Sequence, residues 1–119
     1  MLNRILVVDD SKFSRKNTIM LLEKLEYEVI GEAVDGLDGV EKYKELAPDL
    51  VITDIEMPNL DGIGLIKEIK NIDANAKILV VSSVVNSQVV QEALRLQATV
   101  VKKPIKEHRL LNAIKLIDR

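Results

Sequence analysis

The sequence predicts an α/β fold: a single doubly wound (βα)5 domain in which five parallel strands alternate with five helices. Five short apolar runs alternate along the chain with five amphipathic stretches. Most of the runs are β-branched and almost continuously apolar, which is typical of strands buried on both faces. Strict alternation implies right-handed crossovers and a parallel sheet covered by helices on both faces. The length of 119 residues suits one compact domain, so residues 1–119 are expected to form a single domain.

The expected strands are the apolar runs themselves, because each is short and is bounded by turn residues or by an amphipathic stretch. Asp-Gly pairs at 35–36 and 61–62 and an Ala-Pro-Asp sequence at 47–49 supply the turn chemistry between elements. In chain order, the expected strands cover residues 5–8, 28–30, 50–52, 78–81 and 99–101.

The expected helices are the stretches whose apolar residues recur at helical spacing. The first follows Ser11, its expected N-cap, and the next three cover residues 37–46, 63–71 and 87–96, the last of these capped by Asn86 or Ser87. The first helix carries Phe13, Asn17, Met20, Leu21 and Leu25, and the fifth has a stripe of Leu110, Leu111, Ile114 and Ile117.

The composition excludes several classes of function. With 17 Lys and Arg against 19 Asp and Glu, the chain has no basic footprint for nucleic acid or an anionic membrane. Three aromatic residues cannot form a base-stacking platform, and the lack of cysteine excludes thiol chemistry and disulfides. The apolar runs are too short to span a membrane, and the first residues do not resemble a signal peptide. We therefore expect a cytoplasmic protein with no nucleic-acid or membrane partner.

Acidic residues follow the first and third expected strands. Asp9 and Asp10 come directly after the first strand, and Asp54 ends the third. A lone aspartate at such a place is usually a surface acid or a helix cap. The carboxyl ends of parallel strands meet at one edge of the sheet, however, and functional sites of doubly wound folds lie there. Three converging carboxylates are hard oxygen ligands suited to Mg²⁺, so a cation site is favoured over chance clustering.

A hydroxyl and an ammonium group follow the fourth and fifth strands. Ser82 and Ser83 end the fourth strand, and Lys102 and Lys103 end the fifth. Taken alone, a serine at such a place is usually a small polar residue at a strand end, and a lysine is usually a solvated surface residue. Beside three carboxylates they complete a site for phosphoryl transfer, in which Asp54 attacks phosphorus while the cation, lysine and hydroxyl stabilise the phosphoryl oxygens.

Five segments, in order along the chain, make the sequence resemble the receiver domains of two-component response regulators. The resemblance spans the whole chain and implies a flavodoxin-like sheet with strand order 2-1-3-4-5. The segments that carry it are Ile5-Leu-Val-Val-Asp-Asp10, Asp49-Leu-Val-Ile-Thr-Asp-Ile-Glu-Met-Pro58, Leu60-Asp-Gly62, Val80-Val-Ser82 and Lys103-Pro104.

The resemblance assigns a role to each residue of the acidic group. It implies that Asp54 is the phosphoacceptor, that Asp10 binds Mg²⁺ directly and that Asp9 binds it mostly through water. The backbone carbonyl of Glu56 would be a further ligand. The side chains of Glu56 and Val84 occupy positions that resemble those at which the family tunes dephosphorylation. For Glu56, a solvated loop acid is an equally good interpretation.

The same resemblance assigns the remaining site residues. Ser82 would be the switch hydroxyl that moves toward the phosphoryl group, and Lys103 the lysine that pairs with it, ahead of a cis Pro104. Lys102 competes with Lys103 on charge alone. The family's lysine directly precedes the proline, and neighbouring strand residues face opposite ways, so Lys103 is preferred. The one histidine, His108, is interpreted as a surface residue.

The sequence departs from the family pattern in the fifth strand and its surroundings. An aromatic residue commonly stands there and turns inward when the switch hydroxyl moves. Counting back from Lys103 places Val100 at this position, with Thr99 or Val101 as alternatives. Smaller departures are Ser83 for alanine, Gln97-Ala98 for Gly-Ala, and Ile105 for phenylalanine after Lys-Pro. These departures spare the phosphorylation residues and concern how phosphorylation is read out.

The expected function is a receiver that accepts a phosphoryl group from a sensor histidine kinase or a phosphotransfer protein and signals to a downstream target protein. Its only enzymatic activity would be slow self-dephosphorylation. It would be a monomer or a weak homodimer. Two alternatives stay open: a pseudo-receiver that binds partners without phosphorylation, and a phosphatase of the haloacid dehalogenase type. The moving element would run from Ser82 through residues 85–87 into the fourth helix. The target surface would include Gln88, Gln91, Glu92, Arg95 and Lys102.

Overall fold

Strands and helices alternate along the computed structural model, which describes residues 2–83 and 87–118. The strands are β1 (Arg4–Val8), β2 (Glu28–Ala33), β3 (Leu50–Asp54), β4 (Ile78–Ser82) and β5 (Thr99–Lys102). The helices are α1 (Lys12–Lys24), α2 (Gly36–Leu46), α3 (Gly62–Ile72), α4 (Gln88–Arg95) and α5 (Glu107–Ile117). Among the described residues, no helix has the length and apolar character needed to cross a membrane.

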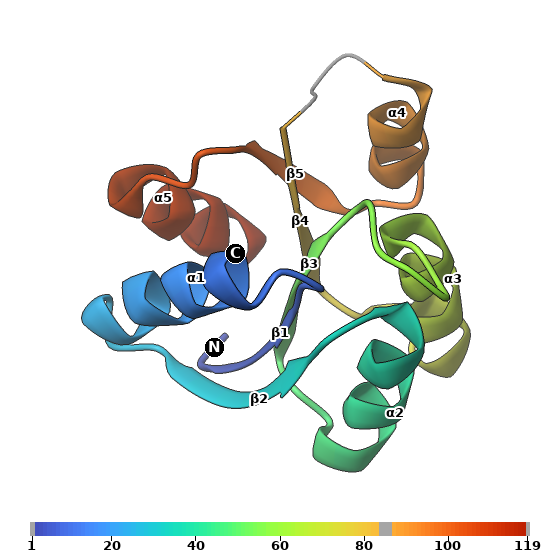
Figure 1. The fold of residues 1–119 in the computed structure, drawn as a ribbon, viewed down its shortest axis with the longest axis horizontal. Coiled ribbons are helices and arrows are strands. Elements are labelled where there is room, and N and C mark those ends of the chain that lie inside the picture. The colour runs from blue at the N-terminus through green and yellow to red at the C-terminus, as the bar shows by residue number, and fades with distance from the viewer. Residues whose placement is uncertain (1, 84–86, 119) are drawn as a thin grey trace.

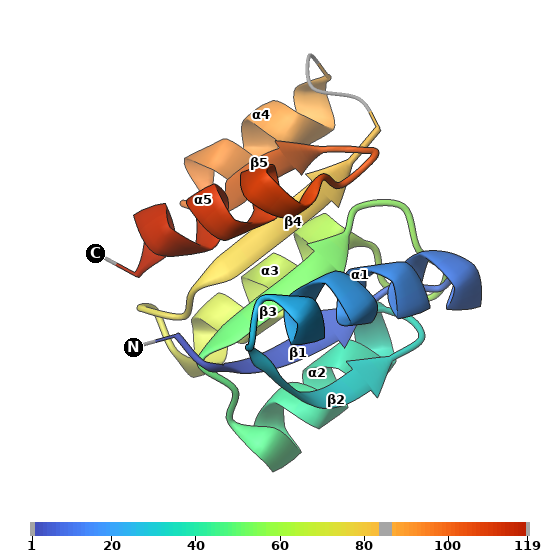
Figure 2. The same ribbon diagram turned by 90° about the vertical axis from the view of Figure 1, so that its left-hand side faces the viewer.

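The five strands form one parallel sheet in the order β2-β1-β3-β4-β5, which confirms the predicted fold class and strand order. Helices α1 and α5 cover one face, and α2, α3 and α4 cover the other (Figure 1). Figure 2, turned by 90°, shows the sheet between these two layers. Because the strands are parallel, the ends of β1, β3, β4 and β5 that carry the polar residues lie along one edge.

Strand β2 is longer than the sequence predicts, since it reaches Ala33 instead of ending at Ile30. Its pairing with β1 shifts register once, between Ile5 and Leu6, and then continues to the pair Val8–Ala33. Gly31 and Glu32 interrupt the apolar pattern of this edge strand without ending it. The extension matters for function, because it brings Glu32 and Ala33 beside the residues that follow β1.

Side-chain caps fix the starts of four helices at or near the functional edge. The predicted caps Ser11 and Ser87 each accept a hydrogen bond from a backbone N–H three residues later, at 3.2 and 3.1 Å. Asp35 and Asp61 cap α2 and α3 in the same way, at 2.8 and 2.9 Å. Each bond satisfies a donor that the first helical turn leaves unpaired. The alternative cap Asn86 lies outside the described residues.

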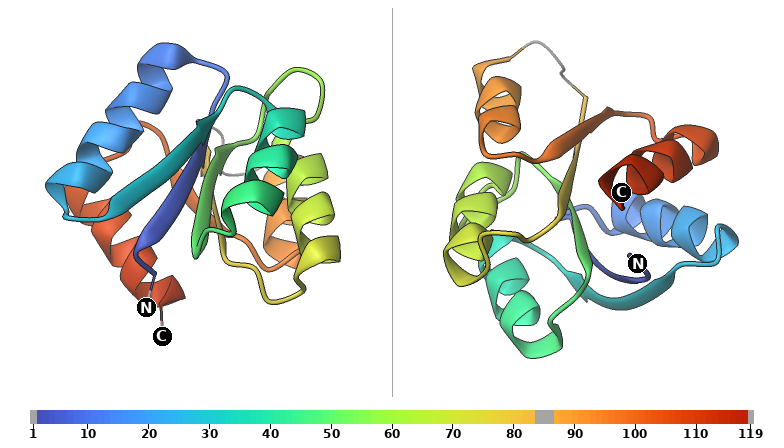
Figure 3. Two further views of the ribbon diagram at one scale, coloured as in Figure 1. Left: turned by 90° about the horizontal axis from the view of Figure 1, so that it is seen from below. Right: turned by 180° about the vertical axis from the view of Figure 1, so that it is seen from behind.

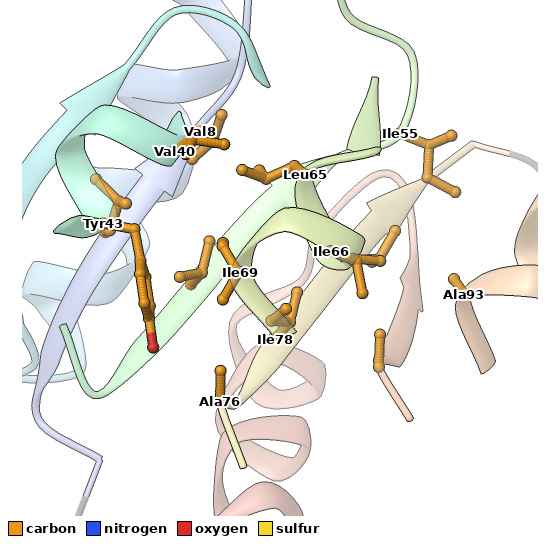
Figure 4. Packing of buried hydrophobic residues seen from close by; sticks show 14 of the residues in the cluster. Val8, Val40, Tyr43, Ile55, Leu65, Ile66, Ile69, Ala76, Ile78 and Ala93 are labelled. Carbon is orange, nitrogen blue, oxygen red and sulfur yellow. The ribbon is translucent and has the colours of Figure 1, made fainter. Parts of the chain in front are cut away.

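The core lies in two layers, one on each face of the sheet. Figure 4 shows part of the layer under α2, α3 and α4, where Tyr43, Leu65, Ile66 and Ile69 pack against strand residues such as Val8 and Ile78. The layer under α1 and α5 contains residues from both helices and from the opposite strand faces, including Ile5, Leu22, Ile52, Leu110 and Ile114.

The predicted apolar positions of α1 are only partly those that face the core. Phe13 and Met20 are 86% and 60% exposed, whereas Thr18 and Leu22 are buried. The hydroxyl of Thr18 donates to the carbonyl oxygen of Ser14 at 3.1 Å, so this polar residue is buried without losing its hydrogen bond. Figure 3 shows α1 and α5 side by side along the sheet, with the ends of the described chain close together. The backbone N–H of Leu2 donates there to the Asp118 carboxylate at 3.0 Å.

Candidate functional site

Three carboxylates meet at the predicted edge of the sheet. Side-chain oxygens of Asp9, Asp10 and Asp54 all lie within 4.8 Å of one another. Asp9 is buried, Asp54 is half-buried and Asp10 is exposed. Like charges this close repel each other and favour a bound cation, and an all-oxygen donor set fits Mg²⁺. The sequence-predicted acidic cluster is therefore present in the fold.

The orientation of Asp9 is set by backbone groups on both sides. One carboxylate oxygen accepts a hydrogen bond from the backbone N–H of Ser11 at 2.9 Å. The N–H of Asp9 donates to the carbonyl oxygen of Ala33 at 3.0 Å, where the extended β2 runs alongside. The Arg15 guanidinium donates to the carbonyl oxygen of Asp9 at 2.8 Å. Asp9 therefore has little freedom to turn away from the other two acids.

The two carboxylate oxygens of Asp54 have different partners. One accepts a hydrogen bond from the backbone N–H of Ile55 at 2.8 Å. The other accepts from the Lys103 ammonium, also at 2.8 Å, and the two side chains are 16% and 29% exposed. A charge-assisted bond in a half-buried place is stronger than a surface ion pair. The bond joins two predicted site residues that lie 49 positions apart in the sequence.

Lys103 reaches Asp54 because of the backbone around it. Its N–H donates to the carbonyl oxygen of Ser82 at 2.8 Å, which extends the β4–β5 ladder by one residue. The peptide bond between Lys103 and Pro104 is cis, as the sequence predicts. Lys102 is exposed at the end of β5. The structure therefore brings the predicted lysine, and not its neighbour, to the carboxylate.

The loop after β3 is held closely against the carboxylate that it follows. The N–H of Gly62 donates to the carbonyl oxygen of Ile55 at 2.7 Å. A Cβ on Gly62 would collide with the carbonyl oxygen of Asp54 and lie 2.8 Å from the Cα of Ile55. Only glycine permits this approach, which explains the Asp61-Gly62 sequence. This loop therefore braces the end of β3 through a backbone contact.

A second bond ties this loop to the loop before α2. Asn59 has a positive φ of 69°, and its side-chain amide donates to Asp35 at 2.7 Å. The pKa of Asp35 is lowered, first by the hydrogen bond from the backbone N–H of Asp38 and then by the one from Asn59. Sequence reasoning did not single out Asn59 or Arg15. Each acts through a tertiary contact with β2 or the loop after it, and no local pattern signals such contacts.

A pocket of about 570 Å³ opens beside Asp54 toward α4. Ser82 is buried at its wall, whereas Ser83 and Glu56 are exposed. The position Val84 and the predicted switch segment at 85 and 86 lie outside the described residues. The pocket is lined by Asp54, Ile55, Glu56, Met57, Asp61, Ser82, Ser83, Ser87, Val89 and Lys103.

No aromatic side chain stands in the described β5. Val100 is half-buried and packs against the core layer that contains Val90 and Ala93 of α4. Val101 is buried in the opposite layer, and Thr99 is half-buried. Val100 is therefore the β5 valine on the same side of the sheet as α4. His108 is exposed on α5, as predicted. The predicted target-surface residues are exposed, apart from the half-exposed Glu92: Gln88, Gln91, Arg95 and Lys102.

Comparison with known proteins places these features in a family context. Residues 5–115 match the family model described as "Response regulator receiver domain". The chain is 44% identical over 117 residues to the chemotaxis protein CheY of Thermotoga maritima, which covers 98% of both chains. It is 45% identical over 115 residues to CheY of Bacillus subtilis, or 96% of both.

A solved structure gives the same picture of the fold. The crystal structure of the CheX-CheY-BeF3-Mg+2 complex from Borrelia burgdorferi matches with a TM-score of 0.93 and 31% identity. The match covers 98% of this chain and 90% of that one.

Proposed function

The chain belongs to the response regulator receiver family, and we propose that residues 1–119 form a single receiver domain that accepts a phosphoryl group on Asp54. The donor would be the phosphohistidine of a sensor histidine kinase or a phosphotransfer protein. The observation that carries the proposal is the half-buried Asp54, within 4.8 Å of two further carboxylates and 2.8 Å from the Lys103 ammonium. CheY-like receiver domains are phosphoacceptors and not classical enzymes.

The transfer step follows from the groups around Asp54. A carboxylate oxygen attacks phosphorus and forms the P–O bond of an acyl phosphate. The P–N bond to the donor histidine breaks, and its electron pair stays on the imidazole nitrogen. Lys103, which now pairs with the carboxylate, would remain close enough to donate to a phosphoryl oxygen. The hydroxyl of Ser82 would donate to another oxygen on the β4 side.

The residues present fit the divalent cation that this reaction needs. Asp10 and Asp54 would hold Mg²⁺ directly, the backbone carbonyl of Glu56 would be a further ligand, and Asp9 would act mostly through water. When bound, the ion neutralises charge on the phosphoryl group. The Borrelia burgdorferi complex contains both Mg²⁺ and BeF3. Its likeness to this chain supports a part for Mg²⁺ in the function of this chain.

The consequence of phosphorylation would be a shift between two existing conformations of the domain. Ser82, the segment after it and α4 would form the element that shifts. The surface of α4, β5 and α5 would then bind a downstream target protein. The receiver itself would work in the cytoplasm, as a monomer or weak homodimer. Its slow self-dephosphorylation would end the signal.

Phosphoryl incorporation tests the proposal directly. The protein is incubated with acetyl phosphate and Mg²⁺ and its intact mass is measured, with Asp54→Asn as the control. We expect one added phosphoryl group in the wild type, none in the variant and none when Mg²⁺ is chelated.

Other outcomes would favour the alternatives. Incorporation that survives Asp54→Asn, or no incorporation at all, would contradict the proposal. Steady turnover of a phosphate ester would indicate a phosphatase. Partner binding that is identical in the wild type and in Asp54→Asn would indicate a pseudo-receiver.

A further inference from the structure

Arg15 is a largely covered cation next to the acidic cluster, and it has no role in the transfer step. It lies one turn into α1, and its side chain is only 11% exposed. Its Nη1 donates to the carbonyl oxygen of Asp9 at 2.8 Å, and its Nε donates to the Glu32 carboxylate at 2.8 Å. The guanidinium therefore bridges α1, the end of β1 and the end of β2.

Glu32 is itself fixed from the other side. Lys42 of α2 donates to the carbonyl oxygen of Glu32 at 3.0 Å and pairs with Asp38 at 3.4 Å. Asp38 in turn accepts a hydrogen bond from the backbone N–H of Val34 at 3.0 Å. Glu32, which pairs with Arg15, thus belongs to a network of hydrogen bonds and ion pairs that extends from α2 to the acidic cluster.

We propose that Arg15 is a positioning residue for the cation site: through the Asp9 backbone it holds the Asp9 carboxylate in the geometry that binds Mg²⁺. The inference rests on the proposed function, because it assigns a part of the same site. Asp9 is bound at its N–H by Ala33, at its carbonyl by Arg15 and at its carboxylate by Ser11. Of these three, the Arg15 contact is the one made by a side chain and can be removed by substitution.

The direction of the change in Mg²⁺ affinity when Arg15 is removed distinguishes a positioning role from a purely electrostatic one. A positive charge near a divalent cation repels it, so Arg15 acting only as a charge would weaken Mg²⁺ binding. Its removal would then tighten the binding. If Arg15 positions Asp9, its removal loosens the binding, because outer ligand-supporting contacts typically contribute about tenfold or more in metal affinity. The two roles predict opposite changes in one measurable constant.

The test is the Kd for Mg²⁺ by titration calorimetry on the full chain, compared across three variants. Arg15→Gln is expected to raise Kd about tenfold. Arg15→Lys keeps the charge but loses the planar fork that serves two acceptors at once, so it is also expected to raise Kd. Glu32→Gln keeps an acceptor for Arg15 without the charge and is expected to raise Kd by less.

The matched control is Arg95→Gln. Arg95 also pairs with a glutamate, Glu92, at 2.7 Å, but it is 71% exposed and lies on α4. The same substitution there is expected to leave Kd for Mg²⁺ unchanged. A lower Kd in Arg15→Gln, or wild-type Kd in Arg15→Lys, would overturn the proposal. If both Arg15 variants fail to fold, the Glu32→Gln value decides: a Kd equal to that of the wild type overturns it.

A metal-free measurement and a phosphorylation assay complete the test. Without metal, hydrogen exchange at the Ser11 amide reports its bond to Asp9, and we expect faster exchange in Arg15→Gln than in Arg95→Gln. Equal exchange would contradict the positioning role. At saturating Mg²⁺, Arg15→Gln should still take up one phosphoryl group. Lack of phosphoryl uptake by the wild type would instead contradict the proposed function, so the two failures are distinguishable.

Discussion

Two regions of the molecule meet at the phosphorylation edge and are held together very differently. The acceptor region, at the ends of β1 and β3 with the loops that follow, is fixed by backbone bonds. The Asp54 carboxylate accepts from Ile55, whose carbonyl accepts from Gly62, and Asp9 accepts from Ser11. Each of these distances is 2.9 Å or less.

The readout region consists of β4, α4 and β5, and its helix is short. Helix α4 has eight residues, against 11 to 13 in the other helices. Its charged contact with α3 joins Lys67 to Glu92 at 3.9 Å, and the half-buried Val100 of β5 packs against the core layer beside it. A short helix has few internal hydrogen bonds, so it changes conformation at lower free-energy cost than a long one. The difference indicates that the chemistry is built rigidly and the readout loosely, so the two are separable by mutation.

The largest expected effect is at the contact between the two regions, Lys103. Replacing Lys103 with Gln removes the charged donor to Asp54 and should slow phosphoryl incorporation by about 100-fold or more. Lys102→Gln is the matched control, because this neighbouring lysine is exposed and should leave the rate unchanged. Initial rates of mass gain with acetyl phosphate measure both. Equal rates in the two variants would show that the Asp54–Lys103 pair plays no part in transfer.

Two glycines at the start of α3 test how rigid the acceptor region is. Gly62→Ala places a Cβ against the Asp54 backbone, which cannot move aside, and should destabilise the protein by about 1–3 kcal/mol. In Gly64→Ala the Cβ meets the end of the flexible Leu60 side chain, and the better helix propensity offsets the contact by up to about 1 kcal/mol. Urea unfolding measures both free energies. If Gly62→Ala is as stable as Gly64→Ala, the loop is looser than the comparison requires.

The acceptor region was also the part that the sequence predicted best. Near-continuous apolar runs define the strands, and a parallel sheet necessarily gathers the ends of those runs at one edge. The places of Asp9, Asp10 and Asp54 were therefore predictable from their positions at the strand ends. The one-residue choice between Lys102 and Lys103 needed the neighbouring proline and the alternation of strand faces.

The parts that the sequence did not predict depend on tertiary contacts or on satisfied polar groups. The buried face of α1 includes Thr18, which counts as polar but bonds to its own helix, while the apolar Phe13 is exposed. Arg15 and Asn59 gain their roles from contacts with Glu32 and Asp35, which lie 17 and 24 residues away. The spacing of these residues along the chain therefore does not predict that they are in contact.

A smaller effect is expected from the readout region. Val100→Ala removes two methyl groups from a half-buried place beside α4 and should cost about 1 kcal/mol. Because the site bonds do not involve this side chain, phosphoryl incorporation should proceed at the wild-type rate. Urea unfolding and mass gain measure the two quantities on the same sample. Slower incorporation would show that readout and chemistry are coupled through β5. It would contradict the view that the two regions are separable by mutation.

The smallest effects concern two titrating carboxylates: Asp35, which Asn59 of the acceptor region contacts, and Glu92 in the readout region. The pKa of Asp35 is lowered chiefly by a backbone hydrogen bond. The pKa of Glu92 is lowered chiefly by the hydrogen bond from Arg95, with further attraction from Arg95 and Lys67. A depressed folded-state pKa means that the unfolded state binds the proton more tightly. Each carboxylate therefore stabilises the fold above its unfolded pKa, and the stabilisation is lost as pH falls through the folded-state value.

Salt separates these two carboxylates, because it screens attraction between exposed charges and leaves a backbone hydrogen bond nearly intact. Between low salt and about 1 M NaCl, the Glu92 pKa should rise toward its ordinary value, while the Asp35 pKa should stay low. Carboxyl carbon shifts in an NMR titration resolve both residues, and Arg95→Gln should raise the Glu92 pKa without moving that of Asp35. An Asp35 pKa as sensitive to salt as that of Glu92 would mean that the loop before α2 is held by charge and not by its backbone. The contact between Asn59 and Asp35 would then add no rigid anchor to the acceptor region.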